Sequence, residues 1–402
     1  MAGTLEPLGD KRRGALLGAM FLMATSAVGP GFIVQTTSFT VQLGAALAFA
    51  ILVSILVDIA IQLNVWRVIG VSGRRAQELG NAVFPGIGWL LAVLIFFGGM
   101  VFNIGNVAGS GLGANAMFGA DPKLGGIVSA LVAIAVFLIR RAGAALDRIV
   151  VVLGAVMIVL TGYVAIVSQP PVGLAIRNAV IPEQVDFLII TTLIGGTIGG
   201  YITYAGAHRM LDSGVTGPKR VGEISRSSVL GILVTGVIRV LLFLAIFGVV
   251  AGGAVLAEEN QAADAFRIAA GELGLRVFGI ILWAASITSV IGAAYTSISF
   301  VTSSATSERR RNLYTCGFIA VSACVFLLLG QAPTTLLIMA GGINGLILPI
   351  GFAIILWVAW RRRDLLGGYV YPTWLLVLGV LAWLLTLFLG YQSLGGLGRL
   401  WG

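Results

Sequence analysis

Two glycine-rich interruptions stand inside apolar segments that are long enough to cross a membrane. The first is SAVGPGFIV at 26–34, and the second is IGGTIGGYITY at 194–204. Glycine costs a helix interior about 1 kcal/mol relative to alanine, and Pro30 removes a backbone donor and clashes with the preceding turn. A helix that breaks inside a membrane leaves N–H and C=O groups unpaired, which is tolerated only where they line a cavity or are buried in protein. The two stretches therefore predict a polar binding site at membrane depth.

The rest of the chain supplies the helices that must position these breaks. The chain is 58% hydrophobic and 10% charged, and apolar runs of roughly 20 residues are what a membrane-spanning helix needs. We identify eleven such segments, at about 14–43, 44–68, 85–117, 124–141, 145–168, 187–211, 228–256, 274–304, 312–330, 333–360 and 371–393. No linker is long enough to separate a soluble domain, so the sequence predicts one all-α integral membrane domain over 1–402.

The basic residues predict the orientation of this domain. Most of the 25 Lys and Arg residues fall between segments on one side, including the runs at 11–13, 309–311 and 361–363. Such residues are retained in the cytoplasm. We therefore expect a cytoplasmic N-terminus and an external C-terminus, in a prokaryotic plasma membrane. The same bias accounts for the net charge of +9, so no nucleic-acid partner is expected.

The two breaks stand five segments apart, in the first segment and the sixth. Because five is odd, the second unit enters the membrane from the opposite side, which is typical of an inverted-topology repeat. The first repeat would cover about 14–168 and the second about 187–360, with an extra helix at 371–393. In such folds the substrate binds near the midplane, between the two broken helices. Packing glycines, as expected for GNVAGSGLG at 105–113, are the alternative explanation.

Two charged residues, Asp58 and Arg239, lie inside apolar segments, each about ten residues from the expected cytoplasmic end. Their segments, the second and the seventh, are counterparts in the two repeats, so the side chains could meet as an intramembrane charge pair. Ionisable residues at this depth commonly mark a functional site. A buried pair that only fixes helix packing is the alternative.

The sequence resembles the natural resistance-associated macrophage protein (Nramp) family of divalent metal transporters over about 16–360. VQLG at 41–44 matches the run after the family's first break, which aligns the family's Asp-Pro-Gly-Asn signature with 29–32. The family's Met-Pro-His aligns with 199–201, and LILP at 346–349 fits the tenth segment. The resemblance implies a LeuT-type fold of the APC superfamily, a 5+5 inverted repeat with broken helices 1 and 6. It also implies a secondary transporter that works by alternating access.

The family's metal ligands are missing from the matching positions. Gly29 and Gly199 have no ligand side chain, and Phe32 has no donor atom, where the family has Asp, Met and Asn. Asn103 and Asn106 stand where the family's proton route has acids, and amides do not titrate. The resemblance therefore predicts an atypical, proton-uncoupled member that does not take up Mn²⁺ or Fe²⁺ by the usual mechanism.

The predicted substrate site consists of the residues at both breaks and their polar neighbours. Its members are Gly29, Pro30, Gly31, Phe32, Gln35, Gly199, Gly200, Tyr201, Asn103 and Asn106. Further polar groups are expected from Thr25, Ser26, Thr197, Thr203, Tyr204 and Asn344. Such a site could hold a hydrated divalent cation such as Mg²⁺ through water, which the resemblance favours. It could also hold a small neutral polar solute, which avoids the cost of a dication without a carboxylate.

Other function classes have less support from the sequence. A membrane sensor that kept the fold and lost transport is the main alternative. No nucleophile–base set, metal cluster or phosphate loop indicates an enzyme, and no cofactor is expected. The expected partners are membrane lipid and the solute or cation, and the oligomeric state stays open. The single histidine, His208, is expected to be a solvated residue at a helix end rather than a proton relay.

Overall fold

The computed structural model describes residues 24, 27–138, 142–303, 306–329 and 332–394, which form helices and their connections without a strand. The helices are α2 (Pro30–Leu43), α3 (Leu47–Ser72), α4 (Ala76–Val83), α5 (Ile87–Phe118), α6 (Pro122–Leu138), α7 (Ala142–Val167), α8 (Val172–Val180), α9 (Phe187–Ile198), α10 (Ile202–Asp212), α11 (Val221–Ala251), α12 (Gln261–Val301), α13 (Glu308–Leu329), α14 (Pro333–Arg361) and α15 (Thr373–Leu394). Short 3-10 turns at Gly44–Ala46, Pro218–Arg220 and Glu258–Asn260 lead into α3, α11 and α12.

The long apolar helices match the predicted membrane segments. Within the described residues, eight helical stretches are long and apolar enough to cross a membrane, and the α7–α8 pair, bent by 107°, makes a ninth. One of the eight, Pro30–Ser72, joins α2 to α3 and so covers parts of two predicted segments, while α6 is a shorter apolar helix. The all-helical membrane fold is thereby confirmed. The short helices α4 and α8 lie in connections where no helix was predicted.

Both predicted helix breaks are present. Ala24 and Ala27 are helical, the next two residues are not, and α2 begins at Pro30. A proline at this first helical position loses no hydrogen bond, because the N–H there would be unpaired anyway. The second break separates α9 from α10 at 199–201. Gly200 has a φ of 53°, in the left-handed region where a side chain is disfavoured.

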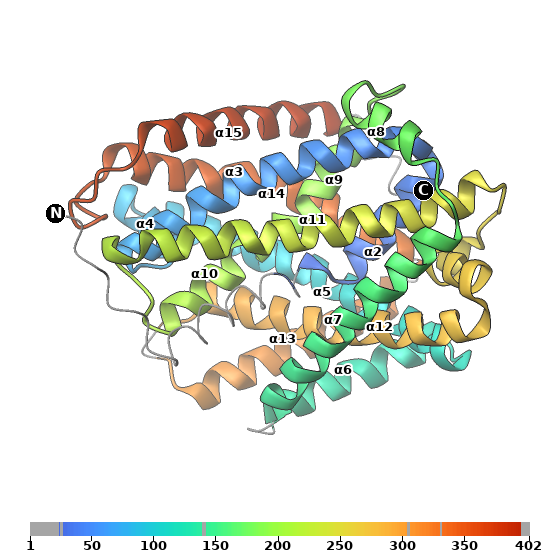
Figure 1. The fold of residues 1–402 in the computed structure, drawn as a ribbon. Helices are drawn as coiled ribbons and strands as arrows, with labels where there is room; N and C mark the ends of the chain where they lie inside the picture. The colour runs from blue at the N-terminus through green and yellow to red at the C-terminus, as the bar shows by residue number, and fades with distance from the viewer. Residues whose placement is uncertain (1–23, 25–26, 139–141, 304–305, 330–331, 395–402) are drawn as a thin grey trace.

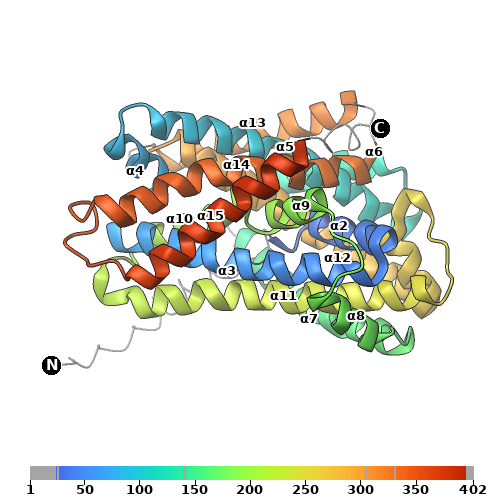
Figure 2. The same cartoon turned by 90° about the horizontal axis from the view of Figure 1, so that it is seen from above.

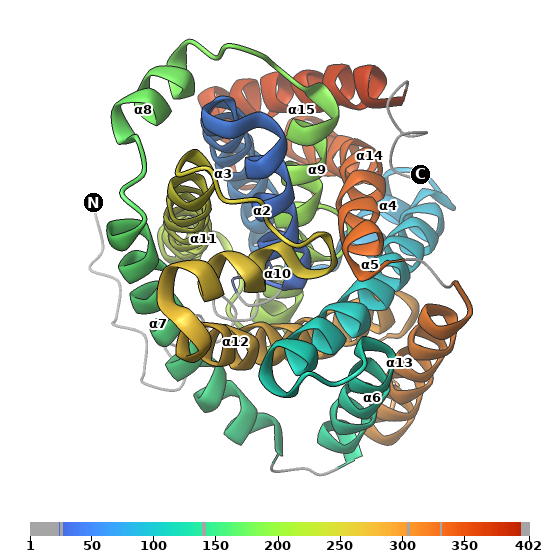
Figure 3. The same cartoon turned by 90° about the vertical axis from the view of Figure 1, so that its right-hand side faces the viewer.

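The two broken helices form the centre of the molecule. The helices run along a common long axis, with α15 at one edge and α6 and α13 at the opposite edge (Figure 1). From above, α15 crosses the bundle obliquely beside α14 and α3 (Figure 2). Viewed along the axis, α2, α9 and α10 lie inside a ring that includes α3, α11, α12, α5 and α14 (Figure 3). Residues 29–32 and 199–201, at the two breaks, are buried within these helices.

Some helix limits differ from the predicted ones, and the difference moves the two charged residues. The seventh predicted segment, expected at 228–256, corresponds to α11, which begins at Val221 and ends at Ala251. Arg239 therefore lies nearer to the Ala251 end of its helix. Asp58 likewise lies nearer to Leu47 than to the other end of α3. The helix ends that were expected to be cytoplasmic, Ser72 of α3 and Val221 of α11, therefore lie farther from the two residues than expected, because the polar residues that begin α11 and end α3 are also helical.

Candidate functional site

The first break packs closely against α5 and α12. A Cβ atom on Gly29 would lie 2.5 Å from Ser289 Oγ and 3.7 Å from Asn106 Oδ1. A Cβ on Gly109 would lie 2.2 Å from Pro30 Cβ, so this glycine lets α5 approach the start of α2. The packing role predicted for the glycines at 105–113 is thus confirmed at Gly109. A longer side chain at position 29 would have to displace Ser289.

The second break packs against Asn344 of α14. A Cβ on Gly200 would lie 1.8 Å from Asn344 Oδ1. Asn344 Nδ2 donates to the Gly98 carbonyl at 3.0 Å and to the Ala340 carbonyl at 2.9 Å. The amide therefore ties α14 to α5 directly beside the break. The left-handed backbone and the close contact both require glycine at position 200.

Tyr201 turns from the second break toward α5. Its ring packs edge-on against Phe102 with centroids 5.5 Å apart, and its hydroxyl lies near the Asn106 amide. Asn106 therefore joins the two breaks, since it also faces Gly29. Asn103 does not: its Nδ2 donates to Ser322 Oγ on α13 at 3.1 Å. One turn of helix separates the two asparagines, and only Asn106 joins the residues at the breaks.

Gln35 lies where α2, α9 and α14 meet. Its Nε2 donates to the Leu337 carbonyl at 2.9 Å. Cβ atoms on Gly196 and Gly341 would lie 2.2 and 2.4 Å from the Gln35 amide, so two glycines make room for it. Gly31 lies on the same side of α2, with its Cβ position 3.7 Å from the Leu337 carbonyl oxygen. The predicted neighbours Thr25 and Ser26 lie outside the described residues.

Arg239 of α11 reaches both broken helices. Its guanidinium carbon lies 4.1 Å from the centroid of the Phe32 ring, a cation–π contact. Its Nη1 donates to Thr197 Oγ1 at 2.7 Å and to the Leu193 carbonyl at 3.4 Å. Phe32 lies in the first turn of α2 and Thr197 in the last turn of α9. A permanent positive charge therefore lies between the two breaks, on contacts that sequence reasoning did not predict.

Asp58 lies beside the same threonine. It is close enough to Arg239 for electrostatic interaction, and both side chains are 1% exposed. Among the described residues, however, none of the five salt bridges joins them. Thr197 donates its single hydroxyl proton to the Leu193 carbonyl at 2.8 Å, so that proton is not available to Asp58. The two charges are buried neighbours without direct ionic contact.

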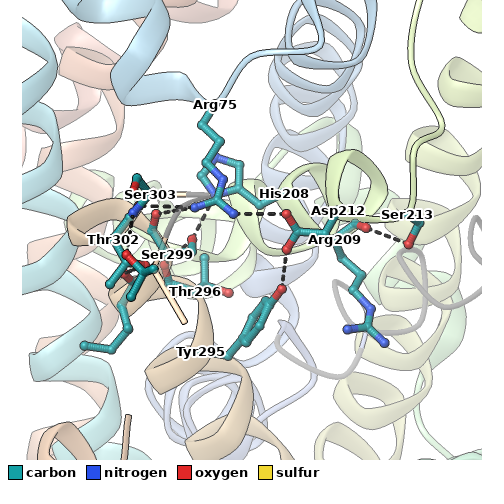
Figure 4. Close-up of polar contacts among 12 residues, drawn as sticks. Arg75, His208, Arg209, Asp212, Ser213, Tyr295, Thr296, Ser299, Thr302 and Ser303 are labelled. Carbon is teal, nitrogen blue, oxygen red and sulfur yellow. Dashed lines mark hydrogen bonds and ion pairs between the residues drawn. The ribbon is translucent and has the colours of Figure 1, made fainter. Parts of the chain in front are cut away.

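A second group of polar residues joins the far end of α10 to α4 and α12 (Figure 4). Arg75 Nη2 contacts Asp212 Oδ1 at 3.0 Å, and its Nη1 donates to the Ser299 carbonyl at 2.9 Å. The Tyr295 hydroxyl donates to Asp212 Oδ2 at 2.5 Å, and His208 Nδ1 lies 2.9 Å from Ser299 Oγ. We call Arg75, His208, Asp212, Tyr295 and Ser299 the Arg75 cluster. It holds α10 to two neighbouring helices.

The expectation that His208 is solvated was wrong. Its side chain is 0% exposed, because the Phe300 ring packs on it at 4.8 Å and Tyr204 covers it at 6.1 Å. Nothing in the sequence distinguishes Arg75 from the many other basic residues, and no local pattern indicates its partners. A contact that joins three segments far apart in the chain leaves no periodic signal.

The chemistry available at the breaks differs from that of a metal centre. Across the described residues, no group of three or more His, Cys, Asp or Glu could hold a metal ion. Around the two breaks lie one guanidinium, the single carboxylate of Asp58, amides, hydroxyls and aromatic rings. This set suits a polar solute that forms hydrogen bonds.

Comparisons with known proteins agree with this architecture. The family model of the natural resistance-associated macrophage protein-like (Nramp) proteins matches residues 20–395. The "Uncharacterized membrane protein YcsG" of Bacillus subtilis (strain 168) is 49% identical over 380 residues, covering 94% of each chain. An "Uncharacterized membrane protein" of Haemophilus influenzae is 52% identical over 365 residues, covering 90% of this chain and 91% of the relative.

Solved structures share the fold at low sequence identity. A crystal structure of the Eremococcus coleocola manganese transporter, in complex with an aromatic bis-isothiourea substituted compound, has a TM-score of 0.75 at 19% identity, covering 98% of this chain and 90% of that one. The crystal structure of MhsT in complex with L-phenylalanine has a TM-score of 0.69 at 15% identity, covering 97% and 100% of the two chains. The predicted LeuT-type fold is thus confirmed. The chain belongs to the Nramp family, a family of secondary transporters and not of enzymes.

Proposed function

We propose that this Nramp-family protein carries a small polar organic solute across the membrane by alternating access, and that transition-metal ions are not its substrate. The observation that supports this most strongly is the Arg239 guanidinium between Phe32 and Thr197. Phe32 stands where the resemblance places a metal-binding asparagine of the family. A dication bound beside Phe32 would meet the Arg239 guanidinium, and the neighbouring Asp58 carboxylate could offset only part of the positive charge then present.

The packing at the first break supports the same proposal. Gly29 stands where the family has an acidic ligand, and Ser289 Oγ would be 2.5 Å from a Cβ there. Gly199, at the position of the family's methionine, offers no thioether. Without soft sulfur or a carboxylate at these positions, selection of a transition metal has no chemical basis.

A hydrated divalent cation is less well supported than an organic solute. Mg²⁺ keeps most of its waters and could bind through them. Its two charges would still lie near Arg239, and Asp58 offsets only one of the positive charges present. The sequence left open a small neutral polar solute as the alternative, and an organic solute of this kind agrees better with the amides and aromatic rings at the breaks.

Alternating access is supported by the arrangement of the broken helices. α2, α9 and α10 lie inside the ring of other helices (Figure 3), and Phe32 and Tyr201 are 1% and 0% exposed. The Arg75 cluster holds the far end of α10, which the proposed orientation places at the cytoplasmic side. Opening a path to that side would require α10 to separate from α4 or α12. Asn103 and Asn106 replace the family's acids, so we propose that any coupled proton uses other groups.

Solute exchange in proteoliposomes tests the proposal. The purified protein is reconstituted and assayed for exchange of Mn²⁺, Mg²⁺, amino acids, sugars and small carboxylates. We expect exchange of an organic solute, and we expect Gly31→Leu and Gly199→Leu to abolish it by filling the breaks. Gly162→Ala is the matched control, since a Cβ there meets no other atom within 4 Å. Exchange of Mn²⁺ without any organic solute would contradict the proposal, and binding without exchange would indicate a sensor.

A further inference from the structure

We infer that the transported solute is a small organic monocarboxylate and that the Nε–Nη2 edge of Arg239 binds its carboxylate group. This inference rests on the proposed transport of an organic solute and names the chemical class of that solute. It also assigns a role to a buried arginine that helix packing alone does not explain.

The protein uses only some of the hydrogen-bond donors of Arg239. A guanidinium has five N–H donors in one plane. Nη1 bonds Thr197 and the Leu193 carbonyl, and the face of the group rests on the Phe32 ring. Among the described residues, Nε and Nη2 have no hydrogen-bond partner, although the side chain is 1% exposed. One complete edge of a buried cation is therefore unpaired.

The unpaired edge has the geometry of a carboxylate receptor. The parallel N–H groups of Nε and Nη2 match the two oxygens of a carboxylate and bind it in a bidentate manner. An arginine that served only to pack helices would be expected to satisfy these donors, because buried unpaired donors are costly. A ligand that supplies two acceptors would remove this cost at the position between the two breaks.

Asp58 limits the net charge of the ligand. Its two carboxylate oxygens are also buried and have no hydrogen-bond partner within the described part of the chain. Arg239 and Asp58 cancel each other when the site is empty, so a carboxylate adds one uncompensated negative charge at membrane depth. Binding is favoured when one positive charge enters with it. That charge is either an ammonium group of the ligand itself or a proton that Asp58 accepts and later releases.

The single guanidinium and the burial of the residues at the breaks favour a small ligand of low charge. Phe32, Tyr201 and Asn106 are between 0% and 2% exposed, and only one guanidinium is available to neutralise an anion. A monocarboxylate with a short side chain agrees with both facts. A phosphate or a dicarboxylate would bring a second negative charge that nothing described at this site offsets.

Ligand-dependent thermal stability of the purified full chain tests this inference. The probes are glycine, L-proline, acetate and L-lactate, each compared with its primary amide and with inorganic phosphate. We expect at least one carboxylate to raise the melting temperature in a saturable manner, as a ligand that binds only the folded state must. Its amide should have no effect. Stabilisation by glycine or L-proline alone would identify an ammonium group as the compensating charge, and stabilisation by acetate or L-lactate would identify a proton.

Variants of Arg239 separate binding from packing. Arg239→Gln should abolish the carboxylate effect, and Arg239→Lys should require at least tenfold more ligand, because an ammonium group cannot form the planar fork. Arg226→Gln, at an exposed position on the same helix, is the matched control. If Arg239→Gln does not fold, Arg239→Lys and Phe32→Leu provide the comparison. A carboxylate shift that persists unchanged in the Arg239 variants would overturn the inference.

Binding and exchange assays together distinguish a failure of the carboxylate assignment from a failure of the proposed transport. Exchange of sugars or other uncharged solutes, with no response to any carboxylate, would overturn the carboxylate assignment and leave organic-solute transport intact. A carboxylate that binds through Arg239 but is never exchanged across the membrane would support the assignment and contradict transport.

Discussion

The Arg239 guanidinium carbon lies 4.1 Å from the centroid of the Phe32 ring, so the seventh predicted span contacts the first turn after the first helix break. The same guanidinium bonds Thr197, two residues before the second break. An Nramp protein with this arrangement has a fixed cation close to the positions where the family resemblance places the metal ligands. We therefore expect Arg239 to determine which class of substrate this chain binds.

Restoring the family's acid at position 29 is not expected to restore metal binding. In Gly29→Asp, the new Cβ would lie 2.5 Å from Ser289 Oγ, and any bound metal would still be repelled by Arg239. We expect no saturable Mn²⁺ binding by isothermal titration calorimetry. Gly29→Ala separates the steric effect from the charge effect. Micromolar Mn²⁺ binding by Gly29→Asp alone would show that position 29 determines the substrate and Arg239 does not.

The substitution Gly200→Ala is expected to destabilise the protein through backbone strain and a steric clash. The backbone there has a φ of 53°, and a left-handed conformation costs a residue with a side chain about 1–2 kcal/mol. The added Cβ would also collide with Asn344 Oδ1. The melting temperature of Gly200→Ala should fall by several degrees, and Gly162→Ala should not change it. Adding Asn344→Ala should recover only part of the loss, because the backbone strain remains.

Much of the fold could be predicted from the sequence because its signals are local. Apolar length identified the spans, and glycine and proline at 29–31 and 199–200 identified both breaks. The kink at Gly271, where φ is 65° within α12, was not predicted, because 261–270 is too polar to be read as part of a span. α4 and α8 were also missed, because helices of eight and nine residues are too short to be recognised by the apolar length that identifies a span.

The site was predictable only in part. The family resemblance suggested both asparagines on α5, but helix rotation directs Asn103 to Ser322 and leaves Asn106 at the breaks. The sequence placed Asp58 near Arg239 by symmetry, and the two are buried neighbours, but it did not indicate the contacts of Arg239 with Phe32 and Thr197. Contacts of this kind depend on how helices from distant parts of the chain are rotated about their axes. No spacing rule within one segment contains that information.

The ion pair between Arg75 and Asp212 is expected to contribute to stability through a coupled network. Either Arg75→Gln or Asp212→Asn leaves buried donors or acceptors of the Arg75 cluster unpaired, at a cost of about 1–3 kcal/mol. The double variant should cost less than the sum of the two, as contacting residues do. Arg74→Gln, at the exposed neighbouring position, is the control. Additive losses in thermal unfolding would mean that the two residues act independently.

The orientation of the chain can be tested with reporters fused to its C-terminus. The distribution of Lys and Arg predicts a cytoplasmic N-terminus and an external C-terminus. A C-terminal alkaline phosphatase fusion should therefore be active in bacterial cells, and a C-terminal green fluorescent protein fusion should be dark. The converse result would place the Arg75 cluster on the external side and reverse the direction in which α10 would open.

Uptake of a labelled small carboxylate into proteoliposomes is the decisive test of whether Arg239 binds the transported solute. The ligand that stabilises the protein best is assayed with the original chain, Arg239→Lys, Arg239→Gln and the Arg226→Gln control, with and without excess Mn²⁺. We expect uptake that Mn²⁺ does not inhibit, that falls at least tenfold in both Arg239 variants, and that Arg226→Gln leaves unchanged. Uptake of Mn²⁺ by the original chain, unaffected by loss of Arg239 and without carboxylate uptake, would contradict this expectation.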